Sequence, residues 1–165
     1  MKTTLSRTAV MVAGLLATNV TLSPGQHFQP PTYDYDPRLL VLKRFFEDRG
    51  SPIDHLAKDF LLAADHYGLD WRLLPSISVI ESGGGKEFTN NNIFGWDNGK
   101  AHFPSIQAGI HLVARRLAIS RIYKNKDLDE KLSVYNSNAE YPALVKSVMA
   151  RLASDEPPQP GASRL

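Results

Sequence analysis

The sequence has no cysteine among its 165 residues. A disulfide framework, a cysteine-based zinc site, a thiol nucleophile and a lipidated N-terminal cysteine are therefore excluded. The sequence also lacks any apolar run of about 18 residues, the length that a membrane-spanning helix needs. What is present is ordinary for a globular protein, because 42% of the residues are hydrophobic and 22% are charged.

The chain also has almost no excess of basic over acidic residues. The formal net charge is +2, and Lys2 and Arg7 lie in a segment that we interpret below as a removable leader. Without these two of its 19 basic residues, the chain balances its 17 acidic residues. Nucleic-acid binding normally requires a basic surplus, so we expect no nucleic-acid partner. The histidines lack the close spacing of zinc ligands, and we expect neither a metal nor another cofactor.

The first residues follow the pattern of a signal peptide. Lys2 and Arg7 precede the short apolar stretch 9–17, as a basic n-region precedes an apolar h-region. We therefore predict a signal peptide over residues 1–17 and an exported protein, periplasmic or extracellular. After removal of the leader we expect no membrane span. A buried first helix is the alternative interpretation of the same stretch.

Proline marks the segments on either side of the domain. Residues 18–37 are rich in proline, which lacks a backbone donor and fixes its own φ, so they predict an extended linker. Tyr33 and Tyr35 could dock onto the domain, although a solvated linker is the simpler interpretation. Residues 154–165 are also proline-rich and predict a disordered tail. The folded unit is then residues 38–153, enough for one hydrophobic core, and we expect it to be a monomer.

Apolar residues recur at three- and four-residue spacings throughout this unit, which predicts an all-α fold. Ser51 is expected to cap the second helix, and Ser105 a later one. Asp127 and Glu130 have the spacing of a capping box. We expect about six helices around one core in a mainly helical arrangement, with a small irregular or hairpin segment at residues 93–103.

Glu81 is the residue best placed for chemistry. Leu73, Ile77 and Ile80 share the buried face of a predicted helix, and Glu81 lies at the edge of that face beside Leu74. It also lies at the helix C-terminus. Partial desolvation and the negative end of the helix dipole both favour the neutral carboxyl group, which a general acid requires. The alternative is a surface glutamate whose stem packs along the apolar face.

The residues that follow Glu81 are suited to a sugar polymer. The glycines at 83–85 carry no side chains and let a polymer approach the backbone closely. The asparagines at 90–92 can both donate and accept, which suits sugar hydroxyl and acetamido groups. Trp96 can stack on a pyranose ring, whereas Phe94 suits the core equally well. The alternative is an asparagine-rich turn anchored by aromatic side chains.

Four segments together resemble one family. Residues 80–83 read Ile-Glu-Ser-Gly, residues 91–95 read Asn-Asn-Ile-Phe-Gly, and residues 134–136 read Val-Tyr-Asn, followed by Tyr141. Residues 103–110 fit the helix that comes after the family's cleft turn. In this order the segments resemble the lysozyme-like superfamily of peptidoglycan glycosidases, in particular its endo-β-N-acetylglucosaminidase and lytic transglycosylase branches.

The resemblance covers about residues 55–152 and implies a lysozyme-like fold and a glycosidase. It implies that Glu81 is the catalytic acid and that Tyr135 orients either Glu81 or the acetamido group of the substrate. The substrate would be a peptidoglycan glycan strand, cut at a β-1,4 bond between GlcNAc and MurNAc. The residues implied to bind it are Ser82, Asn92, Phe94, Gly95, Trp96, Asp97 and Asn136.

The sequence departs from the family where a second carboxylate would be expected. The transglycosylase Gly-Leu-Met-Gln turn is absent, and only Glu87 and Asp97 are available as a second acid. Because two-carboxylate glycosidases need a separate base or nucleophile, a route assisted by the acetamido group of the substrate is the simpler expectation. Water would then give hydrolysis, whereas the MurNAc 6-hydroxyl would give a 1,6-anhydro product. The sequence leaves both outcomes open.

Two functions of other classes compete with the enzyme. A non-catalytic glycan-binding module would keep the cleft without turnover. A secreted helical adaptor would carry Glu81 only as a surface charge, and this hypothesis predicts no groove joining Glu81, Trp96 and Tyr135.

A local basic patch has two interpretations. It is either a solvated helix face, which we favour, or a surface that attracts the acidic peptide stems of the cell wall. Its residues are Arg115, Arg116, Arg121, Lys124 and Lys126.

Overall fold

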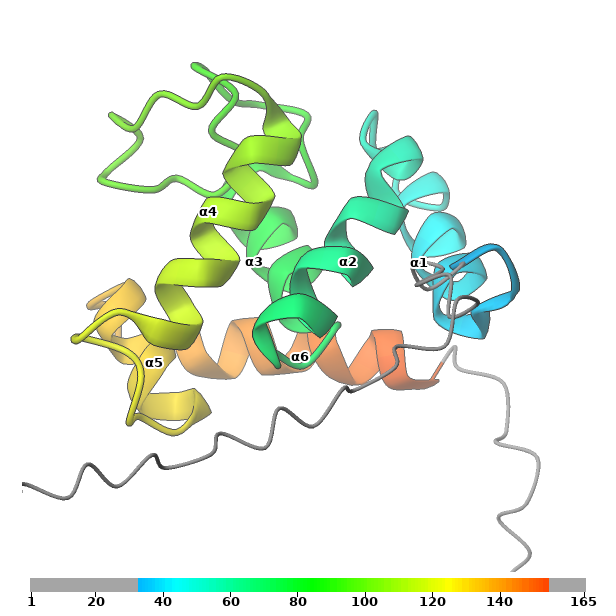
Figure 1. Cartoon of the computed structure of the whole chain (residues 1–165). Coiled ribbons are helices and arrows are strands. Elements are labelled where there is room, and N and C mark those ends of the chain that lie inside the picture. The colour runs from blue at the N-terminus through cyan, green and yellow to red at the C-terminus, as the bar shows by residue number, and fades with distance from the viewer. Residues whose placement is uncertain (1–32, 155–165) are drawn as a thin grey trace, which may run out of the picture. The chain divides into compact units, whose positions relative to one another are not determined.

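The computed structural model of the chain describes residues 33–154, and every structural statement below concerns these residues. The predicted signal peptide over residues 1–17, the first part of the predicted linker and the tail beyond residue 154 lie outside them. The helices are α1 (Pro37–Glu47), α2 (Ala57–Tyr67), α3 (Leu73–Ser82), α4 (Ile106–Ile119), α5 (Leu128–Tyr135) and α6 (Tyr141–Ser154), as Figure 1 shows. The described residues contain no strand, so the predicted all-α fold is confirmed.

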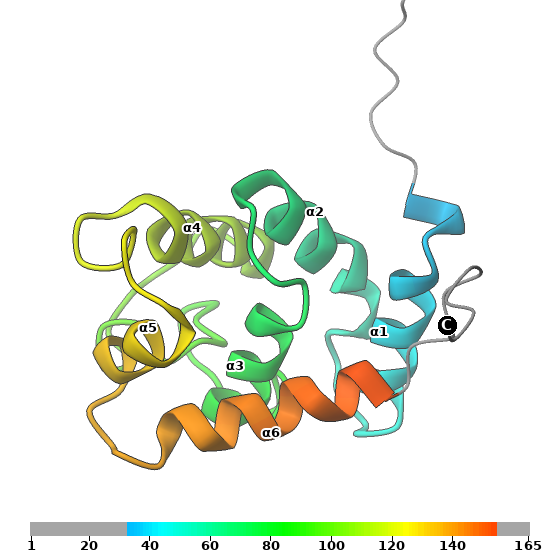
Figure 2. The ribbon, with the colours of Figure 1, turned by 90° about the horizontal axis from the view of Figure 1, so that it is seen from below.

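Helix α3 is the central element. Its residues from Leu73 to Ser78 are all buried, as expected for a helix that is apolar on every side. Helix α6 packs against α3 and α5, while α2 packs against α1, α3 and α4. Figure 2 shows α6 crossing in front of α3, with α1 and α2 on one side and α4 and α5 on the other. The C-terminal end of α3 is therefore fixed by packing along most of the helix.

One core cluster joins all six helices to the segment between α3 and α4. A row of aromatic rings runs through it, from Phe45 to Phe46 (centroids 5.5 Å apart), then to Phe60 (5.4 Å) and Phe94 (6.3 Å). Such edge and tilted pairs are favourable beyond the area that they bury. Phe94, which the sequence left undecided between core and cleft, has no exposed surface and belongs to the core.

Two of the predicted helix caps are confirmed. The Ser105 hydroxyl accepts the Ala108 N–H at 3.1 Å and begins α4. At the start of α5, the Asp127 carboxylate accepts the Glu130 N–H (2.8 Å) and the Glu130 carboxylate accepts the Asp127 N–H (2.9 Å). This reciprocal pair is the predicted capping box.

The predicted cap at Ser51 is wrong. A 3-10 turn at Asp54–Leu56 precedes α2, which begins only at Ala57. Ser51 is buried, and its hydroxyl donates to the carbonyl of Gly84 in the turn after α3. A side chain at Gly84 would meet the Ser51 hydroxyl at 3.2 Å. Ser51 thus supports the glycine turn next to Glu81, a tertiary contact that local capping rules do not predict.

Of the two alternatives predicted for residues 93–103, an irregular segment or a hairpin, the structure has the irregular one, made of turns without a strand. The physical reason is the left-handed backbone of four residues with φ between 51° and 57°, namely Asn90, Asn91, Asp97 and Asn98. Asparagine and aspartate tolerate this conformation better than most residues. The Asn91 amide donates to the Phe103 carbonyl at 2.9 Å, and the Phe103 N–H donates to the Asn90 carbonyl at 3.0 Å. These bonds close the segment into a loop.

Residues before the predicted domain boundary at residue 38 also pack onto the domain. Tyr33 is buried, and its hydroxyl donates to the Asp65 carboxylate at 2.8 Å. Arg38 donates to both oxygens of Asp65 (2.9 and 2.8 Å) and also pairs with Asp36, the N-cap of α1. Tyr33 therefore docks onto the domain, whereas Tyr35 is 93% exposed. This clamp ties the start of the domain to α2.

The clamp predicts a dependence of stability on pH. Hydrogen bonds from Arg38 lower the pKa of the Asp65 carboxyl below its usual 3.8. A lowered pKa in the folded state stabilises the fold at pH values above 3.8, and this contribution is lost as the pH falls through the lowered value. Asp65→Asn should reduce the free energy of unfolding at pH 7 by about 1 kcal/mol, because the pair is partly exposed and screened by solvent.

Urea denaturation of the full chain at pH 7 and pH 2 measures this effect, and the difference between wild type and variant should nearly vanish at pH 2. Asp59→Asn on the same helix is the matched control, since no ion pair involves Asp59. Equal losses at both pH values would contradict the account.

Candidate functional site

Glu81 lies in the last turn of α3, one residue before the helix ends at Ser82. The helix stops there because Gly83 adopts a left-handed conformation (φ 62°). The Gly83 N–H then donates to the Val79 carbonyl (3.1 Å) and the Gly84 N–H to the Ser78 carbonyl (3.0 Å). These bonds satisfy carbonyls that the end of a helix leaves unpaired. Glu81 is half-buried at this rigid end.

Ser82 connects α3 to the loop that follows it. Its side chain is only 4% exposed. Its hydroxyl oxygen lies 2.7 Å from the Ile93 carbonyl oxygen and 2.9 Å from the Ser78 carbonyl oxygen, and it accepts the Gly85 N–H at 3.0 Å. Ser82 thus fixes the position of residue 93 relative to the helix end. It lies beneath the surface and cannot contact a bound polymer.

Asn92 sets the shape of the next turn. Its amide nitrogen donates to the Trp96 carbonyl and its amide oxygen accepts the Trp96 N–H, both at 3.0 Å. With one hydrogen bond at each end of the amide and the side chain 4% exposed, Asn92 shapes the turn and does not line the pocket. Phe94, inside the same turn, packs into the core. These contacts hold Gly95 at the surface, next to Glu81.

Gly95 lies against the Glu81 carboxylate. It has a left-handed backbone (φ 60°), and a Cβ atom there would come within 2.5 Å of Glu81 Oε2 and 3.3 Å of Cδ. Any other residue would therefore displace the carboxylate and also strain the backbone. The glycine keeps the carboxylate at its observed position.

Three aromatic side chains surround this contact. The Tyr135 hydroxyl donates to the Phe94 carbonyl at 2.6 Å, which secures the turn from the side of α5. The Tyr135 ring packs edge-on against Trp96 (5.4 Å) and stacks on Tyr141 (5.8 Å, 7° between planes). The aromatic cluster forms a wall that joins the ends of α3, α5 and α6.

The electrostatics of this wall reflect the nearby carboxylate. Burial raises the pKa of Tyr135 well above its usual value, and the negative charge of Glu81 raises it further. Burial also raises the pKa of Tyr141, with Glu81 as the next cause. Tyr141 faces Glu81, although its buried hydroxyl has no partner at hydrogen-bonding geometry among the described residues. Both phenols are therefore neutral donors beside Glu81.

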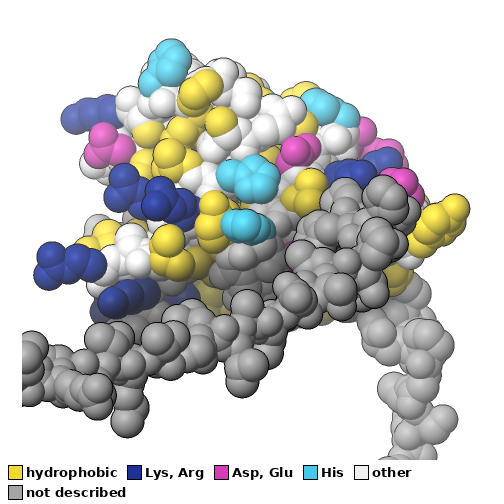
Figure 3. All heavy atoms as spheres, viewed as in Figure 1, with side chains coloured by type: hydrophobic (Ala, Val, Ile, Leu, Met, Phe, Trp, Pro, Cys, Tyr) yellow, Lys and Arg dark blue, Asp and Glu magenta, His cyan; other side chains and the backbone are white. Residues whose placement is uncertain are grey.

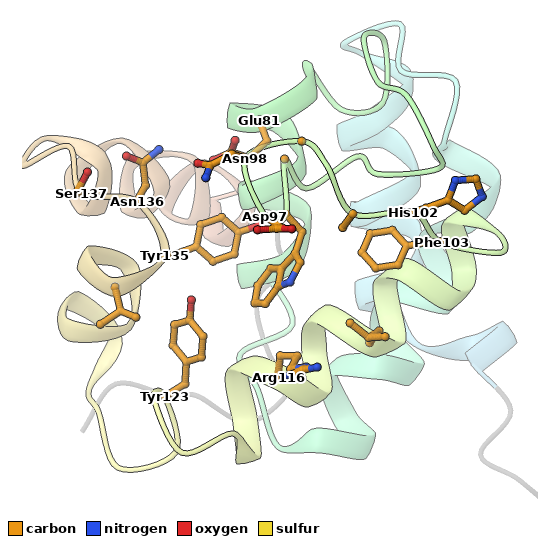
Figure 4. Close-up of a pocket in the computed structure, with 16 residues that line it drawn as sticks. Glu81, Asp97, Asn98, His102, Phe103, Arg116, Tyr123, Tyr135, Asn136 and Ser137 are labelled. Carbon is orange, nitrogen blue, oxygen red and sulfur yellow. The ribbon is translucent and has the colours of Figure 1, made fainter.

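A pocket of about 940 Å³ opens in front of Glu81. This volume is near the upper end of the range for small-molecule sites. In the view of Figure 4, Glu81 and Arg116 lie at opposite ends, with Tyr135 and Asp97 at the levels between them and Tyr123 at the same end as Arg116. The pocket therefore combines one half-buried carboxylate, several aromatic rings and polar side chains in one open space.

The structure brings most of the predicted site together. The predicted residues that line the pocket are Glu81, Gly95, Trp96, Asp97, Tyr135 and Asn136. The predicted residues that do not line it are Ser82, Asn92 and Phe94, which are buried and shape the loop from behind. Of the two candidates for a second acid, Asp97 lines the pocket, whereas Glu87 is exposed outside it. The adaptor hypothesis, which predicted no groove at Glu81, Trp96 and Tyr135, disagrees with this geometry.

Sequence reasoning missed several pocket residues. Tyr123 lies in the loop after α4, and Arg116 lies on α4 itself. Arg116 belongs to the basic patch named from the sequence, but no motif placed either residue in the site, and only the packing of α4 beside the loop 91–103 does so. Asn98 could have been predicted from the sequence, because it follows Asp97 in a turn between Gly95 and Gly99, and such a turn exposes its side chains. Tyr141 closes the site from behind.

The described residues hold no group of three or more histidine or acidic side chains that could bind a metal ion. None of the described helices is long and apolar enough to pass through a membrane. A comparison of the chain with models of known protein families found no match, and a comparison with curated proteins found none either.

The contact between Gly95 and Glu81 leads to a test that does not depend on function. Gly95→Ala should move the Glu81 carboxylate, and the left-handed backbone should add a cost of about 1 kcal/mol in the free energy of unfolding. The carboxyl ¹³C chemical shift of Glu81 at pH 7 reports the displacement.

Gly68→Ala is the matched control, because Gly68 is also left-handed (φ 64°) but has nothing within 4 Å of its would-be Cβ. It should lose a similar free energy of unfolding and leave the Glu81 signal in place. A Glu81 signal that does not move in Gly95→Ala would refute the contact.

Proposed function

We propose that this chain is a glycosidase of peptidoglycan glycan strands, with Glu81 as the general acid. One observation carries the proposal: the Glu81 carboxylate lies at a fixed helix end, against Gly95, at the wall of an open pocket of about 940 Å³. The resemblance of the segments around Glu81, Gly95 and Tyr135 to lysozyme-like glycosidases agrees with this arrangement. An exported enzyme would meet such a polymer.

The composition of the pocket supports a sugar substrate. Aromatic faces such as that of Trp96 suit the apolar faces of pyranose rings, and the side chains of Asn98, Asn136 and Ser137 offer donors and acceptors for hydroxyl groups. The wall carries two carboxylates, Glu81 and Asp97, and one guanidinium group, Arg116, among mostly neutral polar and aromatic residues, which suits the backbone of a glycan better than a strongly charged polymer. The pocket is open to solvent, as a site for a polymer must be.

Glu81 would donate its proton to the glycosidic oxygen as the bond from this oxygen to the anomeric carbon breaks. The carbonyl oxygen of the substrate's acetamido group would attack the anomeric carbon and share the positive charge. Water would then add to that carbon and return a proton to Glu81, which completes hydrolysis. If the MurNAc 6-hydroxyl added instead, it would lose its proton to Glu81 and form the 1,6-anhydro sugar.

Tyr135 would act mainly as a positioning residue. Its hydroxyl donates to the Phe94 carbonyl, so it holds the turn that carries Gly95 against Glu81. Its oxygen can still accept a hydrogen bond from the acetamido N–H of a bound sugar.

Asp97 is the available second carboxylate, and its role separates two mechanisms. If Asp97 were a base or nucleophile, its loss would cost as much activity as the loss of Glu81. In the substrate-assisted mechanism, Asp97→Asn should keep at least about a tenth of the activity, because a general acid–base group is worth about 100-fold or more. Asparagine also accepts the left-handed backbone at this position (φ 55°).

The test is digestion of purified cell-wall sacculi with product masses as the readout. Glu81→Gln should lower the rate at least about 100-fold while the far-UV circular dichroism stays unchanged. Glu87→Gln is the matched control, since Glu87 is exposed in the adjacent loop outside the pocket. Product masses distinguish reducing ends from 1,6-anhydro ends.

Two results would count against the proposal. Full activity of Glu81→Gln would end the assignment of the acid. Tight binding of glycan fragments by the wild type without any product would favour the non-catalytic glycan-binding module.

A further inference from the structure

A second, smaller pocket adjoins the one in front of Glu81. It has a volume of about 320 Å³ and is lined by Trp96, Arg116, Ser120, Arg121, Ile122 and Tyr123. Three of these residues, Trp96, Arg116 and Tyr123, also line the larger pocket. The two spaces therefore share a wall, and a substituent on a ligand in the larger pocket can reach the smaller one.

Two guanidinium groups give this smaller pocket its charge. Arg116 and Arg121 line it, and none of the described residues that line it is acidic. Neither arginine forms an ion pair or a side-chain hydrogen bond with the described residues. Figure 3 shows that Lys and Arg side chains outnumber Asp and Glu side chains on the half of this face where α4 and α5 lie. The positive charge is therefore available to a ligand.

The walls of the smaller pocket shield it partly from water. Tyr123 is buried, and this burial raises the pKa of its phenol. Trp96 packs against Tyr123 at 6.3 Å. The Ser120 hydroxyl is buried without a hydrogen-bond partner among the described residues, a feature that calls for an explanation in a native fold. A charge-assisted hydrogen bond is stronger beside such walls than in bulk water.

We infer that this Arg116–Arg121 pocket binds a carboxylate on a side branch of the polymer whose backbone occupies the larger pocket. The inference rests on the proposed function, because the branch is the acidic peptide attached to the glycan strand. The planar guanidinium group matches the two oxygens of a carboxylate. The chain would then prefer peptide-bearing strands over strands stripped of peptide.

The position of the arginines distinguishes this pocket from a merely solvated basic face. Arg115, Arg116 and Arg121 are all exposed, but Arg116 and Arg121 line the smaller pocket, whereas Arg115, next to Arg116 in α4, lines neither pocket. Lys124 is likewise exposed in the next loop and lines neither. A general attraction to acidic polymers would depend on all these cations alike, whereas a built subsite depends on Arg121 and not on Arg115.

The test is titration calorimetry with four soluble probes and the full chain carrying Glu81→Gln, so that no probe is turned over. The probes are a GlcNAc–MurNAc disaccharide with its peptide, the same compound with its carboxylates as methyl esters, the disaccharide alone with its lactyl carboxyl group blocked as the methyl amide, and the peptide alone. The free-acid probe should bind about fivefold to tenfold more tightly than its ester. Adding Arg121→Gln should abolish this ratio and leave the affinity for the disaccharide alone unchanged, whereas adding Arg115→Gln should retain the ratio.

The outcomes separate the subsite from the proposed function. An unchanged ratio in Arg121→Gln, or the same loss in Arg115→Gln, overturns the subsite, while binding of the disaccharide still supports a glycan site. Arg121-dependent binding of the peptide alone, with no binding of the disaccharide, supports the anion site and overturns the proposed function. If no probe binds, both are overturned.

Discussion

The contact between Gly95 and the Glu81 carboxylate is the constraint on which the site depends. The turn at 91–96 lies so close to the end of α3 that residue 95 has no space for a Cβ atom beside the Glu81 carboxylate, so this position requires glycine. Buried hydrogen bonds hold the two segments together. The Ser82 hydroxyl bonds to the Ile93 carbonyl, and the Asn92 amide bonds to the Trp96 N–H and carbonyl. Because buried hydrogen bonds are expensive to break, these two side chains keep the turn, and with it Gly95, in place beside the end of α3.

The packing of the other helices fixes the end of α3 and the turn at 91–96 relative to each other. Helix α3 is buried from Leu73 to Ser78 and again at Ser82, so its last turn cannot tilt without disturbing the core. Helix α5 contributes Tyr135, which donates to the carbonyl of Phe94, and α6 contributes Tyr141, which stacks behind it. Preorganisation of this kind is what general acid catalysis demands, since a small displacement of the acid costs much of the rate.

The sequence predicted what depends on local chemistry. Periodicity gave the helices, and Ser105 and Asp127 cap them because their side chains reach amides only three residues away. It assigned the wrong role to Ser51 and did not predict the backbone partners of Ser82 and Asn92, because the partners of these polar groups are set by tertiary packing. The place of Ser82 and Asn92 in the sequence predicts ligand contacts, whereas in the fold both bind backbone groups of the turn. Arg116 and Tyr123 reach the pocket through the packing of α4, which no motif records.

The most direct measurement of the central claim is a crystal structure of the Glu81→Gln protein soaked with a short β-1,4-linked N-acetylglucosamine oligomer. The account predicts sugar rings in the larger pocket, with Trp96 and Tyr135 beside them and a glycosidic oxygen within about 3 Å of the residue-81 side chain, the distance that proton transfer needs. An oligomer bound elsewhere on the surface, or a pocket closed by movement of the turn at 91–96, would contradict it.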